Sequence, residues 1–274
     1  MTPLEDQAPL TEDQTAAYLA RIGAERPQAA TAEALRDLHL RHLTAVPFEN
    51  LSIHLGEDIV LTTQALYDKL VQRRRGGFCY ELNGGFAALL TSLGYGVELL
   101  SARVFMPDGR LGPPYDHMAL RVRTADDPGP WLADVGFGRH THLPLRYADR
   151  ADQRDPGGVF RITEAPEGDD LDVLQEDSPV FRLEQRPREL GDFEATCWWQ
   201  RTSPKSHFTR SLTCSRLTGT GERVTLSGDR LLVTAADGAR TERRIPEGEL
   251  ADAYREHFGM VLDRLPTRPV SHPE

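Results

Sequence analysis

Cysteine is scarce in this chain of 274 residues, and long apolar runs are absent. Only three cysteines occur and none belongs to a CxxC pair, so the sequence predicts neither a disulfide framework nor a zinc site. No stretch approaches the roughly 20 consecutive apolar residues that a membrane-spanning helix needs. The first residues are acidic and lack the basic and apolar regions of a secretion signal. We therefore expect a cytoplasmic protein.

Lysine is also rare, because only Lys69 and Lys205 accompany the arginines among the 32 basic residues. Acidic residues number 42, so the formal net charge is −10. Such a surplus of negative charge disfavours nucleic acids and anionic lipids unless basic residues are concentrated locally. The one tight basic run, Arg73 to Arg75, is too short to cover a duplex. We expect neither a nucleic acid nor a membrane as a partner.

The hydrophobic pattern changes along the chain from helical to strand-like. Before Gly94, helix starts are followed by apolar residues at spacings of three and four. From Gly96 onward, short runs and turn residues predict antiparallel strands, including one at Thr196–Arg201, and Pro246 opens a final helix. The acidic stretch from Glu164 to Asp177 is interpreted as a solvated connection. This segregated order is typical of an α+β fold and not of a doubly wound sheet.

Cys79 is the strongest candidate for a catalytic residue. A helix is predicted to begin at or directly after it, where unpaired N–H groups and the helix dipole favour a thiolate. Gly76 and Gly77 are expected to allow a tight turn and to leave room for a substrate. A lone cysteine beside Phe78 and Leu82 is also compatible with simple core packing. The choice between the two interpretations depends on further residues.

Two residues on neighbouring predicted strands favour the catalytic interpretation. His117 begins one strand, and Asp134 lies within the apolar strand that returns beside it. A carboxylate in an apolar strand needs a partner, and an adjacent imidazole would provide one. Taken singly, His117 is compatible with a half-buried surface histidine and Asp134 with a turn or cap. With Cys79 they would supply a nucleophile, a base and an orienting carboxylate.

Five motifs closely resemble those of the bacterial arylamine N-acetyltransferases, in the order of that family. They are AVPFENL at 45–51, RRGGFCYELN at 74–83, DHMALRV at 116–122, ADVGFG at 133–138 and TSPKSHF at 202–208. In that family the cysteine of the second motif is the acetylated nucleophile, and the next two motifs hold its histidine and aspartate. The resemblance therefore implies Cys79, His117 and Asp134 as the catalytic residues.

The resemblance also implies a three-part fold with a Cys-His-Asp core like that of cysteine proteases. A helical bundle over residues 1–94 would carry the nucleophile, and a β-barrel over 95–203 would carry the histidine and aspartate. An α/β lid would follow over 204–274. Acetyl-CoA would be the co-substrate without a metal, and the acceptor would be a small aromatic amine or hydrazine.

Individual residues are assigned to the two substrates by the same resemblance. The acceptor pocket would be lined by Phe48, Val104, Phe137 and Phe208. Coenzyme A would lie against Gly136, Gly138 and Ser206. The chain departs from the family at Arg139, where many members have a second glycine after GFG. This arginine could meet a phosphate or could simply lie at the surface.

A ping-pong mechanism through an acetyl-cysteine follows from these roles. Cys79 would have to ionise before the thioester arrives, so we expect the imidazolium of His117 and the helix terminus to lower its pKa. After the coenzyme leaves, neutral His117 would accept the proton of the attacking amine. A lid over the site would keep water from the acetyl-cysteine.

Other functional interpretations of Cys79, His117 and Asp134 stay open at this point. Hydrolases and transglutaminase-like enzymes use a similar trio. An amide synthase of the same family would transfer a carrier-bound polyketide acyl chain to an amine. A non-catalytic binding module would retain its function in a Cys79→Ala variant. A homodimer is left open.

Four further residues outside the trio have predicted structural roles. Arg75 and Glu49 flank apolar motif residues, and we predict a structural ion pair between them in preference to simple surface exposure. Cys197 and Cys214 are interpreted as residues packed within strands.

Overall fold

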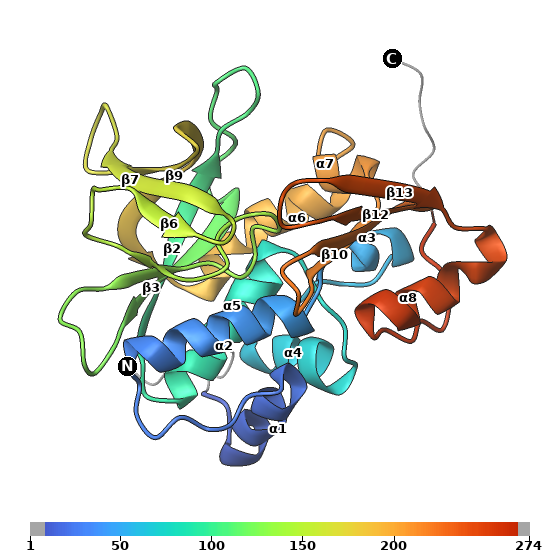
Figure 1. Cartoon of the computed structure of the whole chain (residues 1–274), viewed down its shortest axis with the longest axis horizontal. Coiled ribbons are helices and arrows are strands. Elements are labelled where there is room, and N and C mark those ends of the chain that lie inside the picture. The colour runs from blue at the N-terminus through green and yellow to red at the C-terminus, as the bar shows by residue number, and fades with distance from the viewer. Residues whose placement is uncertain (1–8, 268–274) are drawn as a thin grey trace.

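The computed structural model describes residues 9–267, which form three groups of helices and strands (Figure 1). The predicted α+β class is confirmed, because helices precede an antiparallel barrel and a second antiparallel sheet follows it. None of the helices between residues 9 and 267 has the length and apolar character needed to cross a bilayer.

The N-terminal group consists of short helices. They are α1 (Glu12–Ile22), α2 (Ala32–Ala45), α3 (Leu51–Leu55), α4 (Thr63–Tyr67), its π-helical continuation η2 (Asp68–Gln72) and α5 (Cys79–Ser92). The first begins after Thr11, because the Thr11 hydroxyl accepts the Gln14 N–H and the Gln14 side chain accepts the Thr11 N–H. Gly23, at φ +66°, ends it in the left-handed conformation that favours glycine.

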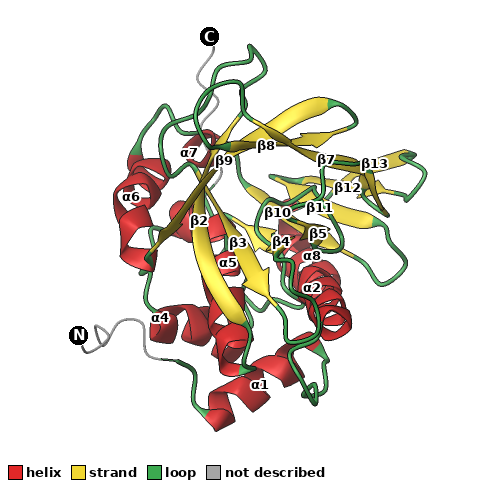
Figure 2. Ribbon diagram, turned by 90° about the vertical axis from the view of Figure 1, so that its left-hand side faces the viewer, coloured by secondary structure: helices red, strands yellow, loops and turns green. Residues whose placement is uncertain are grey.

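An eight-stranded antiparallel sheet closes almost into a barrel. Its strands are β2 (Gly96–Val104), β3 (His117–Arg123), β4 (Trp131–Ala133), β5 (Leu145–Arg146), β6 (Gln153–Asp155), β7 (Gly158–Glu164), β8 (Leu171–Gln175) and β9 (Ser178–Arg188). They are ordered β5-β4-β3-β2-β9-β8-β7-β6. Figure 2 shows α5 behind β2 and β3, and the buried side chains of Phe86, Leu120 and Val122 belong to one shared core.

The C-terminal group is a five-stranded sheet with one helix. Its strands are β1 (Phe48–Glu49), β10 (Thr213–Leu217), β11 (Arg223–Ser227), β12 (Arg230–Thr234) and β13 (Arg240–Arg244), in that order across the sheet. After η4 (Glu247–Glu249), α8 (Leu250–Phe258) packs Tyr254 and Phe258 into the core of this sheet. Because β1 comes from the N-terminal half, the sheet ties both ends of the chain together.

Two predicted elements are wrong. Thr196–Arg201 is not a strand but lies in α6 (Glu194–Thr202), which follows η3 (Leu190–Phe193) and precedes α7 (His207–Arg210). Cys197 and Gln200 are both buried and lie three residues apart, whereas Trp198 is 63% exposed, so burial follows a helical period. The acidic stretch from 164 to 177 is not only a connection, because it contains β8, whose Val173 is buried.

The boundaries predicted for the three parts stay a prediction. In the structure the barrel strands occupy residues 96–188, within the predicted second part.

Candidate active site

Cys79 is the first residue of α5 and is 4% exposed. The helix starts there because the Glu81 carboxylate accepts the N–H of Phe78 at 3.2 Å. Neither preceding glycine has a positive φ. A Cβ at Gly76 would lie 1.9 Å from the carbonyl oxygen of Pro47, and one at Gly77 would lie 2.6 Å from Glu81. These glycines therefore permit close packing of the chain, and the expectation that they leave room for a substrate is wrong.

His117 and Asp134 are joined by a hydrogen bond. The distance between His117 Nε2 and Asp134 Oδ2 is 2.8 Å, and each residue is 2% exposed. His117 begins β3 as predicted, whereas Asp134 follows the last residue of β4 instead of lying inside the strand. The rings of Phe137 and Phe181 pack against the imidazole, with centroids 5.0 and 5.4 Å away. This packing and the carboxylate fix the orientation of the ring.

Three groups besides His117 position Asp134. Its Oδ1 accepts hydrogen bonds from Asn83 Nδ2 at 2.8 Å and from the Gly136 N–H at 2.9 Å. Its own N–H donates to His39 Nε2 at 3.1 Å. Burial opposes the charge of the carboxylate, but the charge and hydrogen bond of His117, with further help from His140 and Asn83, lower the pKa of Asp134 to about 2. Asp134 is therefore an ionised, fully hydrogen-bonded partner for the imidazole.

Asn83 and His39 are site residues that the sequence interpretation missed. Asn83 lies one helical turn after Cys79, and its side chain also donates to the Met118 carbonyl and accepts the Val135 N–H. An amide in the otherwise apolar helix α5, four residues after the candidate nucleophile, was a usable signal. No local pattern could have placed His39, because α2 meets the β4 end only in the folded chain.

Cys79 and His117 line one cavity of about 490 Å³. The other residues that line it are Phe48, Val104, Phe105, Met106, Pro107, Pro113, Asp116, Gly136, Phe137, Trp199, Gln200, Lys205, His207, Phe208 and Arg210. All four predicted acceptor residues are thus brought to the wall of the same space. Aromatic rings supply much of this wall, with Phe208 packed at 5.3 Å from Phe78 and 6.3 Å from Phe48.

The three residues predicted at the coenzyme lie in different settings. Gly136 lines the cavity and packs on the nucleophile, because a Cβ there would lie 2.8 Å from Cys79 Cα. Gly138 has φ +92°, and a Cβ there would lie 3.8 Å from the ring of Phe48. Ser206 is 1% exposed, and its hydroxyl is already hydrogen-bonded within the protein. Only Gly136 of the three lines the cavity.

A hydrogen-bond relay connects this cavity to α7. Gln200 Nε2 donates to Asp116 Oδ1 at 2.6 Å, and Ser206 Oγ donates to Gln200 Oε1 at 2.6 Å. The same hydroxyl accepts the Phe208 N–H at 3.1 Å and so caps α7. Burial raises the pKa of Asp116. The sequence did not predict this relay. It holds α7 in place and thereby positions Phe208 at the cavity.

The electrostatic setting of Cys79 differs from the expectation. Its Sγ lies 4.0 Å from the carbonyl oxygen of Asp116. Burial raises the pKa of the Cys79 thiol, and the negative charges of Asp116 and Asp134 raise it further. The prediction of a lowered thiol pKa is therefore wrong for the free protein, because desolvation outweighs the helix terminus.

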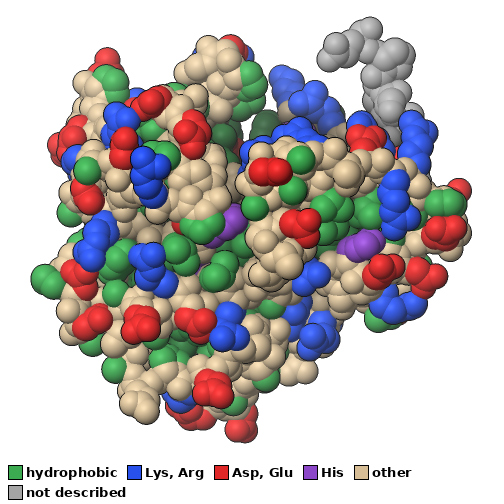
Figure 3. All heavy atoms as spheres, viewed as in Figure 1, with side chains coloured by type: hydrophobic (Ala, Val, Ile, Leu, Met, Phe, Trp, Pro, Cys, Tyr) green, Lys and Arg blue, Asp and Glu red, His purple; other side chains and the backbone are tan. Residues whose placement is uncertain are grey.

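Cationic residues gather at one side of the cavity. Lys205 and Arg210 line it, and Asp116 is the only carboxylate among its lining residues. Burial and the charge of Arg210 lower the pKa of His207 beside them, so this ring is neutral near pH 7. Figure 3 shows a hollow between the barrel and the C-terminal sheet, with Lys and Arg side chains along part of its edge. The opening is thus suited to a ligand with negative charge at one end and an apolar group at the other.

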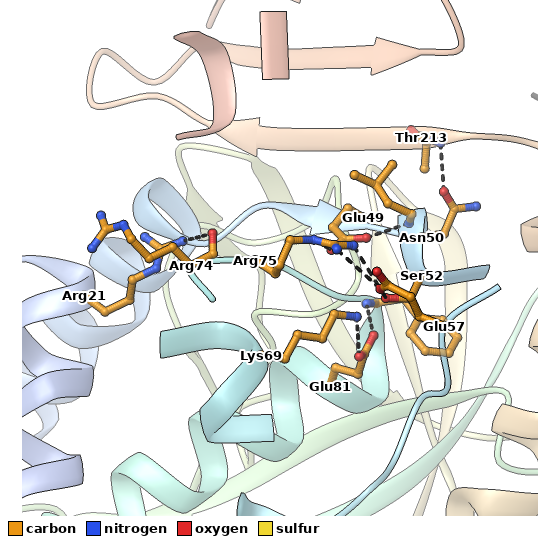
Figure 4. A network of polar contacts seen from close by, with 12 residues as sticks. Arg21, Glu49, Asn50, Ser52, Glu57, Lys69, Arg74, Arg75, Glu81 and Thr213 are labelled. Carbon is orange, nitrogen blue, oxygen red and sulfur yellow. Dashed lines mark hydrogen bonds and ion pairs between the residues drawn. The ribbon is translucent and has the colours of Figure 1, made fainter. Parts of the chain in front are cut away.

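A buried ionic network holds the loop that leads to Cys79 (Figure 4). The predicted ion pair is confirmed, with Arg75 Nη2 2.9 Å from Glu49 Oε1 and side chains 7% and 0% exposed. Arg75 also reaches Glu57 at 3.4 Å, and Lys69 pairs with Glu81 at 2.5 Å. Burial opposes the charge of Glu49, but Arg75 and Lys69 hold its pKa below the usual value. The network joins β1, η2 and α5 around the nucleophile loop.

The other cysteines are free and buried. Cys214 packs within β10, as predicted, whereas Cys197 packs from a helix. Residues 9–267 contain no cluster of three or more His, Cys, Asp or Glu side chains that could hold a metal ion.

Known proteins resemble this chain over most of its length. A family model described as N-acetyltransferase matches residues 31–266. The arylamine N-acetyltransferase of Escherichia coli is 34% identical over 253 residues, which cover 90% of this chain and 88% of that protein. The chain belongs to the arylamine N-acetyltransferase family.

Solved structures of arylamine N-acetyltransferases share this fold. The Salmonella typhimurium protein gives a TM-score of 0.84 at 32% identity, with 92% of each chain covered. A Mycobacterium marinum arylamine N-acetyltransferase in complex with CoA gives 0.81 at 31% identity, covering 90% of this chain and 92% of its own. The resemblance stated from the motifs is confirmed. The chain is an acyltransferase, and its interpretation as a non-catalytic binding module is wrong.

Proposed function

We propose that this protein transfers the acetyl group of acetyl-CoA to an arylamine or arylhydrazine through an acetyl-cysteine at residue 79. The observation that carries the proposal is the convergence of Cys79 and His117 on one cavity, with His117 hydrogen-bonded to an ionised Asp134. The arrangement provides a nucleophile, a base and an orienting carboxylate.

The first step is ionisation of the thiol by its neighbour. A lone thiolate is unfavourable at this buried position, since burial raises the pKa of Cys79. Transfer of the thiol proton to His117 instead creates a thiolate and an imidazolium, whose charges offset each other and whose cation faces Asp134. The nucleophile is therefore formed as an ion pair within the site.

Two acyl transfers then follow. The Cys79 sulfur attacks the thioester carbonyl, the bond from that carbon to the coenzyme sulfur breaks, and His117 returns its proton to the departing coenzyme thiolate. The acceptor amine next attacks the acetyl-cysteine and loses a proton to His117, which passes it to the departing Cys79 thiolate. The amide is the product, and the free enzyme is regenerated.

The cavity supports both substrates. Aromatic side chains at Phe48, Phe137 and Phe208 offer a flat apolar wall to an arylamine, which is uncharged near neutral pH and needs no prior deprotonation. The cationic residues Lys205 and Arg210 suit one of the phosphate groups of coenzyme A. Ser206 is assigned a positioning role for Phe208, because its hydroxyl already bonds Gln200 and the α7 backbone.

Steady-state kinetics test the proposal. With acetyl-CoA and an arylamine varied together, double-reciprocal plots should give parallel lines, and labelled CoA should exchange into acetyl-CoA without any amine. The His117→Gln and Asp134→Asn variants should lose at least a hundredfold in kcat/KM, in the range that a positioned base contributes. Intersecting lines together with no exchange would mean direct transfer in a ternary complex, and the proposal would be abandoned.

A further inference from the structure

A second, smaller cavity lies between the barrel and the C-terminal sheet. Its volume is about 80 Å³, and none of its lining residues lines the cavity at Cys79. It is lined by Arg139, His140, His142, Pro156, Gly157, Leu217, Gly221, Arg223, Thr234, Ala235, Ala236 and Gly238. Figure 1 shows the turn between β12 and β13 next to the loops of the barrel at this place.

Two arginines share this cavity without a carboxylate to balance them. Neither Arg139 nor Arg223 forms an ion pair within residues 9–267, and the side chain of Arg223 donates only to Ser215 Oγ, at 3.3 Å. Burial lowers the pKa of Arg223 to about 10, and the charge of Arg139 lowers it further. Two like charges held together in a half-buried space favour an anion between them.

A carboxylate beside the cavity, Asp155, is already engaged by the backbone. Asp155 accepts the N–H groups of His142, Leu143 and Gly157 at 2.8, 2.9 and 2.6 Å. Burial and the positive charge of Arg223 lower the pKa of His142, whereas the negative charge of Asp155 raises it. The side chains of Asp155 and Arg223 therefore both lie near His142. Asp155 thus shapes the loop beside the cavity and makes no hydrogen bond to either guanidinium.

His140 also lines the cavity, but its ring belongs to the barrel. It is only 3% exposed and packs against Phe137, Phe160 and Phe181, with centroids 5.1, 4.8 and 5.4 Å away. Burial lowers the pKa of His140 to about 4, so its ring is neutral. The positive charge at the cavity therefore comes from the two arginines.

We propose that Arg139 and Arg223 bind a phosphate group in this cavity, and that the phosphorylated end of the acyl donor supplies it. Guanidinium groups bind phosphate oxygens in a bidentate manner, and three glycines keep the space free of side chains. The assignment of the donor rests on the proposed function.

The distance to the nucleophile is compatible with one extended ligand. Gly136 packs on Cys79, and three residues later the chain reaches Arg139, so their Cα atoms are at most about 11 Å apart. Coenzyme A separates its thioester from its phosphates by a long pantetheine arm. A single molecule can therefore reach both places.

Calorimetric titration of the purified protein with coenzyme A, dephospho-CoA, pantetheine and inorganic phosphate tests the site. In Arg139→Met and Arg223→Met, the Kd of coenzyme A should rise about tenfold, which corresponds to one lost charge-assisted hydrogen-bonded pair. The Kd of pantetheine should not change. Arg240→Met, an exposed arginine of β13, should bind every ligand like the parent protein. A weaker effect on dephospho-CoA than on coenzyme A would assign the 3′-phosphate to the site.

Two results would overturn the inference. An unchanged Kd of coenzyme A in both variants removes the phosphate site of the donor. Binding of inorganic phosphate that depends on Arg223 but does not compete with coenzyme A assigns the cavity to another phosphate source. Arg139 is exposed, so its variant remains informative if Arg223→Met does not fold. Acetylation of Cys79 by S-acetylpantetheine, which lacks phosphate, should persist in all variants, and its absence would count against the proposed function alone.

Discussion

A buried thiol beside a buried imidazole explains why Cys79 and His117 must be treated as a pair. Burial and the charges of Asp116 and Asp134 raise the pKa of Cys79, so the sulfur cannot act as an isolated thiolate near neutral pH. The imidazole between the cavity and Asp134 is the available proton acceptor. The proposed mechanism therefore makes reactivity at this sulfur depend on His117 more than on the helix terminus.

Alkylation of Cys79 by iodoacetamide, followed by peptide mass mapping, measures this dependence. In His117→Gln the rate at pH 7.5 should fall at least tenfold, because the thiol then loses its proton only according to its raised pKa. The rate should still be rising above pH 9 in this variant. The control His207→Gln removes a histidine that lines the same cavity without contacting Asp134 and should retain the parent rate. Equal rates in parent and His117→Gln would show that the two residues are not coupled.

The sequence identified the residues with distinctive chemistry and missed those that only support them. Cys79, His117, Asp134 and three of the four cavity-lining residues could be named because they lie within family motifs, whereas Val104 was assigned from the overall resemblance. His39 and the relay from Asp116 to Ser206 act through contacts between distant segments, which no local pattern records, whereas Asn83 left a local signal in the helix of Cys79. The pKa of Cys79 was misjudged for the same reason, since burial depends on the whole fold.

At the scale of elements, the loop before α5 is held by charges and not by apolar contacts alone. Arg75 lies between Glu49 of β1 and Glu57, and Lys69 of η2 pairs with Glu81 of α5 (Figure 4). Removing one partner of such a pair leaves the other charge buried and uncompensated, which is more destabilising than losing the attraction itself.

Substitution of Arg75 by methionine tests this role. Arg75→Met should lower the free energy of unfolding by about 3 kcal/mol, because Glu49 remains buried without its partner. Restoring neutrality in the double variant Glu49→Gln/Arg75→Met should recover part of the loss. Urea unfolding followed by circular dichroism provides the measurement. Arg41→Met, which breaks a surface pair with Asp37, should cost less than about 1 kcal/mol. A similar small effect for Arg75→Met would contradict the structural role.

Helices whose ends carry capping residues were predicted from the sequence. Elements that depend on contacts with distant segments were not. The box at Thr11 and the glycine at residue 23 mark α1 in the sequence itself. In α6 the residues Thr-Cys-Trp-Trp favour a strand locally, but the burial of Cys197 and Gln200 selects a helix. β8 lies among acidic residues and exists because its backbone pairs with β7 and β9.

At the scale of the whole molecule, the helices and the barrel each contain a buried histidine that stays neutral in the fold. Burial lowers the pKa of His42 to about 3 and that of His140 to about 4. The unfolded chain binds protons at these rings as the pH falls below 6.5, while the folded chain does not. The stability that these residues contribute is therefore complete above pH 6.5 and is lost as the pH falls toward 4.

The decrease in the free energy of unfolding at acid pH should reflect the protonation of these histidines in the unfolded chain. Between pH 8 and pH 5, each of these two histidines should lower the free energy of unfolding by about 2 kcal/mol. In His140→Phe, whose new ring would join Phe137, Phe160 and Phe181, the decrease over this interval should be smaller by about that amount. Urea unfolding at both pH values gives the two free energies. An identical decrease in the parent and the variant would show that His140 does not remain neutral in the fold.

Intact-protein mass spectrometry after addition of acetyl-CoA without an amine tests the central claim most directly. The account predicts a gain of one acetyl group on Cys79 that an arylamine or hydrazine removes. The adduct should persist in Cys197→Ala and be absent in Cys79→Ala. No adduct from acetyl-CoA, but one from a carrier-bound acyl thioester, would contradict the proposed donor and indicate an amide synthase. An acetyl group that forms equally in Cys79→Ala would contradict the assigned nucleophile.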